Sequence, residues 1–242
     1  MGRLRRVPCG GDPVTGIDTL LRDIVAEVRY TRHLTGRDAL DPRVMAAMAE
    51  VPREVFVPPP ERAYAFSNGP LPIGWGQTIS QPYIVALMTD LLDCGPDARV
   101  LEVGTGSGYQ AAVLSRVVGR VYTIEIIPAL AEEAAQRLAG LGYTNIETRL
   151  GDGYLGWPEQ APFDGILVTA AAPRIPPPLV EQLRPGARLV LPVGEHIGRQ
   201  ELLVVEKGAD GTTRAQTILP VAFVPLTRGR SQPPGGAADG HT

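Results

Sequence analysis

The sequence predicts an α/β fold in which helices cover both faces of a mainly parallel sheet. Helices are expected at the N-terminal end of this fold and an antiparallel edge at its C-terminal end. From about residue 97, short runs of Val, Ile and Leu alternate with helical segments, as in buried parallel strands joined by helices. The last three apolar runs follow one another without good helices, which indicates a hairpin at one edge of the sheet.

The chain before residue 97 combines helices with an unusual loop. Apolar residues recur every three to four positions from residue 17 to 28, which predicts a first helix. Asp41 can cap a second helix that begins at Pro42. Residues 52–82 hold seven prolines and three glycines with large apolar groups between them. We therefore expect an ordered, packed loop there, followed by a helix at about 82–92.

The remainder of the chain supplies the sheet and its covering helices. Strands are expected at 99–103, 120–126, 146–149, 165–169, 188–192, 201–206 and 217–224. Helices are expected at about 107–118, 128–140 and 176–184.

Composition excludes several classes of protein. Hydrophobic residues make up 44% of the chain and charged residues 20%, too apolar for a wholly disordered chain. The net charge of −3 disfavours a generally basic nucleic-acid binder. Cys9 and Cys94 are too few and too far apart for a disulfide framework or a zinc site. Because no signal-peptide pattern and no membrane-length apolar run is visible, we expect a cytoplasmic protein. We also expect no bound metal.

A glycine-rich turn follows the first strand of the sheet. Residues 102–108 read E-x-G-x-G-x-G and precede a helix, so main-chain N–H groups can approach a ligand closely. The third glycine, Gly108, comes one place too early for the dinucleotide fingerprint, and Tyr109 holds the fingerprint position. No Lys follows the turn, which excludes a Walker-type nucleotide site.

Two acidic residues accompany this turn. Glu125 stands at the tip of the second strand, where it can accept hydrogen bonds from two ribose hydroxyls; a solvated strand end is the alternative. Asp152, in the sequence Gly-Asp-Gly, can accept from the exocyclic amino group of adenine, although Asp-Gly is also a common turn pair. Together these features look like a class I S-adenosylmethionine-dependent methyltransferase of Rossmann-like fold, whose cofactor lies across the carboxyl ends of the strands.

The loop before this core narrows the resemblance. Its segment PLPIGWGQTISQP, residues 70–82, strongly resembles the signature of protein-L-isoaspartate (D-aspartate) O-methyltransferases. Supporting segments are VPRE at 51–54, VLEVGTGSGYQAA at 100–112, GDGYLGWP at 151–158, APFDGILVTAA at 161–171 and FVPLT at 223–227. The resemblance spans about residues 40–230. It implies transfer of a methyl group from S-adenosylmethionine to the α-carboxylate of L-isoaspartyl residues, which leaves S-adenosylhomocysteine and starts repair through a succinimide.

The same resemblance implies the site residues. Ser80 is the expected active-site serine, with capping of the following helix as the alternative. Ile79 and Val224 would also contact the substrate, and Thr78, Ile79 and Thr227 would border the cofactor; Val224 and Thr227 could equally be ordinary edge-strand residues. The other expected cofactor-binding residues are Glu102, Gly104, Thr105, Gly106, Ser107, Gly108, Glu125, Ile126, Asp152, Gly153 and Thr169.

The chemistry requires no strong general base, because a carboxylate is already ionised at pH 7. This fits the absence of a convincing nucleophile: His33, His196 and His241 are expected to be structural or solvent-exposed. Asn68 departs from the family, which usually carries an acidic residue there. Asn keeps the hydrogen-bond acceptor and loses the charge.

We expect one methyltransferase domain at 17–228, with a substrate-side subregion at 17–96 and a cofactor-binding core at 97–228. Residues 1–16 read as a flexible lead-in and 229–242 as a disordered tail. The expected partners are isoaspartyl peptides and damaged proteins, met by a monomer that binds neither nucleic acid nor membrane.

Three other functions stay open at this point. One is a related enzyme that installs isoaspartate in a biosynthetic peptide, which Asn68 slightly favours. Another is a catalytically silent binding module, which the intact motifs disfavour. The third, nucleic-acid methylation, is weaker because residues 169–173 read TAAAP instead of the usual Asn/Asp-Pro-Pro-aromatic motif.

Overall fold

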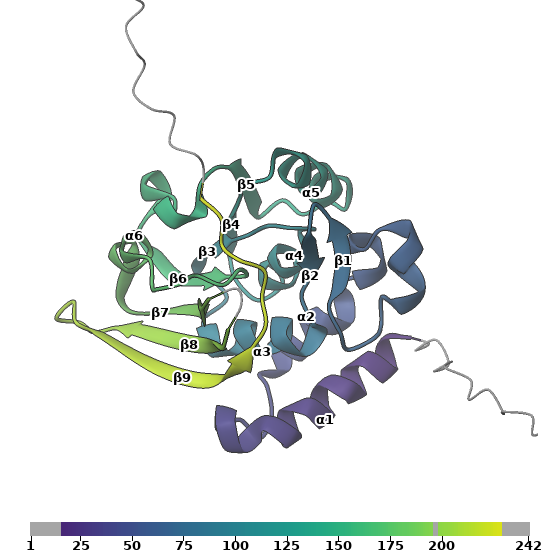
Figure 1. Ribbon diagram of the computed structural model, residues 1–242, viewed down its shortest axis with the longest axis horizontal. Helices are drawn as coiled ribbons and strands as arrows, with labels where there is room; N and C mark the ends of the chain where they lie inside the picture. Colours follow the sequence, from purple (N-terminus) through teal and green to yellow (C-terminus); the bar gives the residue numbers. More distant parts are fainter. Residues whose placement is uncertain (1–15, 196–197, 229–242) are drawn as a thin grey trace, which may run out of the picture.

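A seven-stranded sheet runs through the centre of the molecule (Figure 1), and the computed structural model describes residues 16–195 and 198–228. The order of the strands is β5-β4-β3-β6-β7-β8-β9. Their bounds are β3 Arg99–Val103, β4 Arg120–Glu125, β5 Ile146–Leu150, β6 Phe163–Val168, β7 Leu183–Gly194, β8 Gln200–Lys207 and β9 Thr213–Val221. The expectations for the lead-in, the tail, Cys9, His196 and His241 lie outside the described residues, apart from Gly16 at the end of the lead-in.

The strands from β5 to β7 are parallel, and β8 and β9 add the antiparallel edge that the sequence predicts. Central strand β3 pairs with β4 on one side and β6 on the other. The chain therefore leaves β3 toward one half of the sheet and returns to its other flank for the second half. Ligands of open α/β sheets bind at the carboxyl ends of the strands beside such a switch.

Helices cover both faces of this sheet (Figure 1). Their bounds are α1 Ile17–Thr35, α2 Pro42–Glu50, α3 Pro82–Leu92, α4 Tyr109–Ser115, α5 Pro128–Gly140 and α6 Pro177–Glu181. Every residue of α3 is buried, because this helix packs against α1 and α2 on one side and against β6 and β7 on the other. The carboxylate of Asp41 accepts a hydrogen bond from Arg43 N at 2.8 Å, which confirms the predicted cap of α2.

The proline-rich loop is ordered, as predicted, and contains elements that the prediction lacked. Two short 3-10 helices, Arg53–Phe56 and Pro59–Tyr64, precede a hairpin of β1 Leu71–Gly74 and β2 Gln77–Ile79. Figure 1 shows the hairpin standing beside α4, at the carboxyl ends of the central strands. The loop thereby reaches the place where a ligand of the sheet would bind.

Helix α6 is shorter than predicted because Gln182 redirects the chain. Its side chain accepts from Trp157 N at 2.8 Å and donates to Leu155 O at 2.8 Å. Its carbonyl accepts from Phe163 N at 2.8 Å. These bonds draw the chain into β7 at Leu183, directly after the helix.

Strand β9 also ends earlier than predicted, at Val221. Residues 222–228 leave the sheet edge and cross the carboxyl ends of the central strands as the yellow segment of Figure 1. We call this segment the strap. It is tied to the loop after β6, since Ala171 N donates to Val224 O and Leu226 N donates to Ala171 O, each at 2.8 Å.

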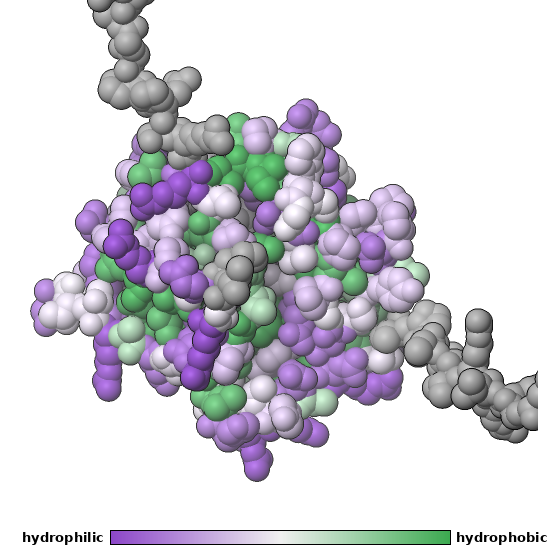
Figure 2. Space-filling model, in the orientation of Figure 1, coloured by the Kyte–Doolittle hydropathy of each residue, from purple (hydrophilic) through white to green (hydrophobic). Residues whose placement is uncertain are grey.

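The surface on this side is mixed in character. Figure 2 shows hydrophobic residues in several separate patches with hydrophilic residues between them. Within residues 16–195 and 198–228, no helix combines the length and the hydropathy needed to traverse a bilayer.

Candidate active site

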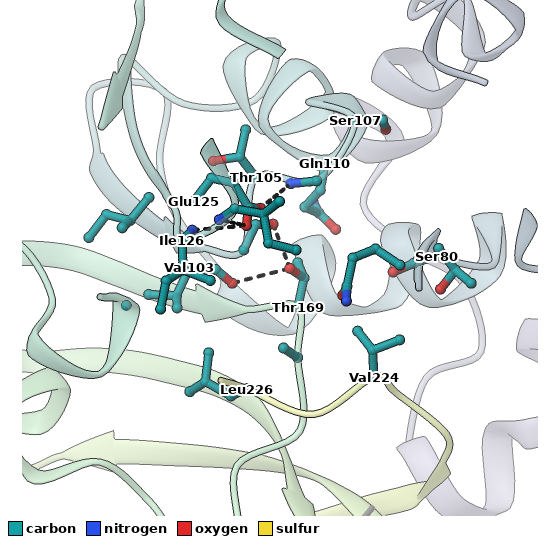
Figure 3. Close-up of a pocket in the computed structure, with 18 of the residues that line it drawn as sticks. Ser80, Val103, Thr105, Ser107, Gln110, Glu125, Ile126, Thr169, Val224 and Leu226 are labelled. Atoms are coloured by element: carbon teal, nitrogen blue, oxygen red, sulfur yellow. Dashed lines mark hydrogen bonds between the residues drawn. The ribbon is translucent and has the colours of Figure 1, made fainter. Parts of the chain in front are cut away.

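A cleft opens where the glycine-rich turn, the loop carrying Ser80 and the strap meet. Figure 3 shows Ser80, Glu125 and Thr169 reaching this cavity from separate segments, and Val224 and Leu226 reaching it from the strap. Its lining includes the following predicted residues: Thr78, Ile79, Ser80, Gly104, Thr105, Gly106, Ser107, Glu125, Ile126, Gly153, Thr169, Val224 and Thr227.

The turn after β3 needs glycine for reasons of space and conformation. Gly104 has a φ of +97°, and a Cβ there would collide with the Thr169 hydroxyl. That hydroxyl donates to Gly104 O at 2.6 Å. The N–H groups of Gly104 and Thr105 both bind Ile124 O, at 2.8 and 3.2 Å. The turn is thereby held against the ends of β4 and β6, with its main chain on the cleft.

Glu125 is fixed at the tip of β4 by three main-chain donors. Gly106 N donates to its Oε2 at 2.8 Å, and Ile126 N and Ile127 N donate to its Oε1 at 2.9 Å each. A carboxylate offers about four acceptor positions. One position on Oε2 therefore stays open for a ligand hydroxyl, where the sequence predicted acceptance from two.

Glu102 lies beneath the turn and is absent from the cleft lining. It is fully buried and pairs across the sheet with Thr123, whose hydroxyl donates to Oε2 at 2.6 Å. Thr105 Oγ1 lies 2.6 Å from the same Thr123 hydroxyl. Within the described ranges Oε1 has no hydrogen-bond partner, and burial raises the pKa of this carboxyl to about 8. Glu102 is thus linked by hydrogen bonds through the hydroxyls of Thr123 and Thr105 to the cleft, which Thr105 lines.

Two further predicted residues lie beside the cleft without lining it. Gly108 faces Leu138, whose side chain would contact a Cβ at 3.3 Å. Asp152 Oδ1 accepts from Tyr154 N at 2.9 Å and begins the 3-10 helix Gly153–Leu155. Asp152 thus forms a turn, its contact with adenine stays a prediction, and its neighbour Gly153 lines the cleft.

The loop carrying Ser80 is anchored by a buried arginine. Arg53 is 0% exposed and donates to Ala65 O at 3.0 Å, Gly69 O at 3.4 Å and Ser80 O at 2.9 Å. Its guanidinium lies 4.8 Å from the ring centre of Tyr109, a stabilising cation–π distance. Burial lowers its pKa to about 10. The main chain at Ser80 is thereby held from inside the protein.

Asn68, and not Ser80, supplies the side-chain cap of α3. Asn68 Oδ1 accepts from Tyr83 N at 3.0 Å in the first turn of that helix. In the part of the chain that the structure describes, the Ser80 hydroxyl has no hydrogen-bond partner, and the residue lines the cleft. The capping alternative for Ser80 is therefore not realised. At position 68 the structure therefore uses the amide oxygen of Asn68 as a hydrogen-bond acceptor.

Several lining residues escaped the sequence prediction. They are Gln77, Val85, Val103, Gln110, Ile124, Ile127, Ala170, Pro225 and Leu226. Gln110 had a signal, because it stands in the first helical turn after the glycines; its amide donates to Thr89 Oγ1 at 2.9 Å.

Among the described residues no three His, Cys, Asp or Glu side chains converge as metal ligands.

Comparison with known proteins decides the family. Residues 31–231 match the family model described as Protein-L-isoaspartate(D-aspartate) O-methyltransferase (PCMT). The chain belongs to this family. The resemblance carried by the PLPIGWGQTISQP segment is thereby confirmed.

Similar proteins cover most of the chain. A protein-L-isoaspartate O-methyltransferase 2 from Syntrophobacter fumaroxidans is 63% identical over 87% of this chain and 85% of its own. One of the same name from Polaromonas is 61% identical over 86% of this chain and 99% of its own. Protein-L-isoaspartate O-methyltransferases of this family use S-adenosylmethionine, and so does this chain.

Two solved structures share the fold. A protein-L-isoaspartate O-methyltransferase matches with a TM-score of 0.76 at 29% identity over 88% of this chain, which spans 66% of that structure. A Plasmodium falciparum protein, described as a putative member in complex with S-adenosyl-L-homocysteine, matches with a TM-score of 0.69 at 22% identity, covering 86% of this chain and 98% of that one. The predicted class I methyltransferase fold is confirmed.

The residues of the cleft fit that cofactor. Glu125 offers an oriented carboxylate to a ribose hydroxyl, and the glycine turn offers close main-chain approach. Apolar side chains of Val103, Ile126 and Leu226 supply surface for the uncharged parts of the molecule. One open acceptor position beside apolar walls suits a ribose hydroxyl and the apolar faces of an adenosine group.

Proposed function

We propose that the cleft holds S-adenosylmethionine beside the α-carboxylate of an L-isoaspartyl residue, and that Ser80 orients this carboxylate for methyl transfer. The observation that carries the proposal is the Ser80 hydroxyl, which lines the cleft and has no competing partner among the described groups. A hydroxyl at this place can donate a hydrogen bond to the acceptor carboxylate of the family's reaction.

The cofactor side of the cleft is formed by the glycine-rich turn after β3 and by Glu125 at the end of β4. S-adenosylmethionine supplies a methyl group on a positively charged sulfur, which a carboxylate oxygen can attack. We assign the open position on Glu125 Oε2 to a ribose hydroxyl. Because the N–H groups of Gly104, Thr105 and Gly106 are bonded within the protein, we assign the carbonyl groups of this turn to the ammonium at the polar end of the cofactor. Thr78, Ile79, Gly153, Thr169 and Thr227 complete the predicted contacts, and their place in the cleft lining supports this.

The acceptor side requires orientation and not a base. A carboxylate with a pKa near 4 is ionised at pH 7, so no proton has to be removed before attack. The Ser80 hydroxyl can donate one hydrogen bond to it, while Arg53 fixes the carbonyl of the same residue at 2.9 Å. Holding both reactants in this geometry is the main source of acceleration for a direct transfer.

We propose repair of damaged proteins as the role of this chain. Asn68 had favoured a biosynthetic variant because it lacks the family's usual charge. Its bond to Tyr83 N uses the acceptor alone, which removes that support. We further propose a cytoplasmic monomer that binds neither nucleic acid nor membrane. The free thiol of Cys94 is compatible with a reducing compartment, and light scattering of the purified chain tests its mass.

A paired-peptide assay tests the activity. The chain is incubated with labelled S-adenosylmethionine and two peptides that differ only in carrying isoaspartate or aspartate at one position. We expect base-labile label on the isoaspartyl peptide and none above background on the other. Equal labelling of both peptides, or none of either, would refute the proposed function.

A further inference from the structure

A second cavity adjoins the cleft on the side of Ser80. Its volume is about 520 Å³, and Thr78, Ser80 and Thr169 line both cavities. We call the new cavity the flank groove. Its own walls are formed by the uncharged polar Gln81 and by the apolar residues Pro70, Ile84, Pro220, Val221, Ala222 and Phe223. No charged side chain lines it within the described residues, in contrast to the cleft with its Glu125.

The main chain of this wall is largely committed to the protein itself. Gln200 is buried and clamps Phe223, accepting from its N–H at 2.6 Å and donating to its carbonyl at 3.1 Å. Val224 O accepts from Ala171 N at 2.8 Å, and Pro220 has no N–H to offer. A peptide in the groove therefore meets side-chain surface at these positions and finds few hydrogen bonds of the kind that extend a sheet.

The position of the groove determines its occupant. The α-carboxylate of the isoaspartyl residue lies at Ser80 in the proposed function, and the peptide chain continues from that residue in both directions. One adjoining residue must pass into the space beside Ser80, which is the flank groove. A charged side chain there would lose its hydration without gaining an ionic partner, whereas an apolar side chain would be buried favourably.

We propose that the flank groove selects isoaspartyl peptides in which the residue adjoining the isoaspartate on one side is uncharged and apolar. This inference rests on the proposed function. It assigns specificity to Ile84 and to the start of the strap, Ala222 and Phe223. Damage sites within apolar segments, which become accessible when a protein unfolds, are then its preferred substrates.

A peptide series tests the preference. Peptides of equal length carry Leu, Gly, Asp or Lys next to the isoaspartate, first on its N-terminal and then on its C-terminal side. We expect kcat/KM to fall about tenfold or more from Leu to Asp and Lys on one of the two sides, as desolvation of a charge requires. Values within twofold for all residues on both sides would overturn the inference. Methylation of no peptide would instead refute the proposed function.

A charge introduced into the groove provides an independent readout. Ala222 is exposed, so Ala222→Asp and Ala222→Lys should fold. We expect Ala222→Asp to raise the ratio of kcat/KM for Lys over Asp peptides severalfold, and Ala222→Lys to lower it. Ala209 is exposed in the turn before β9, and Ala222 follows the other end of that strand. A strand of this length separates the two residues by about 30 Å, so Ala209→Asp is the matched control. The inference fails if the Ala222 variants leave this ratio unchanged or if Ala209→Asp shifts it equally.

Discussion

Replacing Glu102 by Gln should abolish a pH dependence of stability that this carboxyl imposes. Glu102 is 0% exposed, and its single bonded oxygen accepts from Thr123. Burial raises its pKa from 4.5 to about 8. Between these two values the folded protein holds a proton that the unfolded chain has released. The free energy of unfolding therefore falls as the pH rises through this window.

The size of the effect follows from the same two values. One proton difference changes the free energy of unfolding by 1.36 kcal/mol for each pH unit. From pH 4.5 to about 8, the loss attributable to Glu102 is about 5 kcal/mol, an upper figure because buried sites relax. A glutamine cannot titrate, so the variant lacks this slope. Its amide nitrogen replaces an oxygen that had no partner, which adds a pH-independent penalty of about 1–3 kcal/mol relative to the protonated wild type.

The assay is urea unfolding of both proteins at intervals between pH 5 and 7.5. All other titrating groups are common to the two proteins, so the difference between their unfolding free energies isolates Glu102. We expect the wild type to lose stability relative to Glu102→Gln by about 1 kcal/mol for each pH unit. Two curves that stay parallel would show that Glu102 is ionised throughout, and would refute the assignment of a proton to it.

Three further substitutions separate the roles within the site. Ser80→Ala should lower kcat by about 10- to 150-fold, the value of one hydrogen bond to a charged group, with an unchanged calorimetric Kd for S-adenosylmethionine; an unaltered kcat would remove Ser80 from the acceptor site. Glu125→Ala should weaken cofactor binding by about 1.5–3 kcal/mol, and an unaltered Kd would reject the ribose contact. Asn68→Ala should lower the free energy of unfolding by about 1 kcal/mol, whereas Asn68→Asp keeps the acceptor and should not. Equal thermal unfolding temperatures of the two variants would contradict the cap.

Much of the fold could be predicted because proline and strand patterning are local signals. Pro42, Pro82 and Pro128 each stand at the first position of a helix, where their fixed φ is favourable. The β1–β2 hairpin was missed for the opposite reason. Its turn holds Trp75 at a φ of +56° between two glycines, a conformation that large side chains rarely adopt. Its strands of four and three residues are too short to show alternation.

The site divides in the same way. The glycine turn and Glu125 end two consecutive strands, β3 and β4, so their place in the cleft could be predicted from the order of the elements. Leu226 reaches the cleft only through the crossing of the strap, which no local pattern encodes. Glu102 was assigned to the cofactor although side chains alternate along a strand. Val103 points into the cleft, so its neighbour points away, into the pairing with Thr123.

The setting of Ser80 shows how a loop rich in proline, and therefore poor in N–H donors, is held in place. Carbonyl groups of such a loop need donors, and Arg53 supplies them at Ala65, Gly69 and Ser80. The first turn of α3 needs an acceptor, which Asn68 supplies. A carboxylate at position 68 would add charge to a bond that an amide oxygen already makes. Because both needs are met from within the loop, the Ser80 hydroxyl is not drawn into capping the helix and stays available to the substrate.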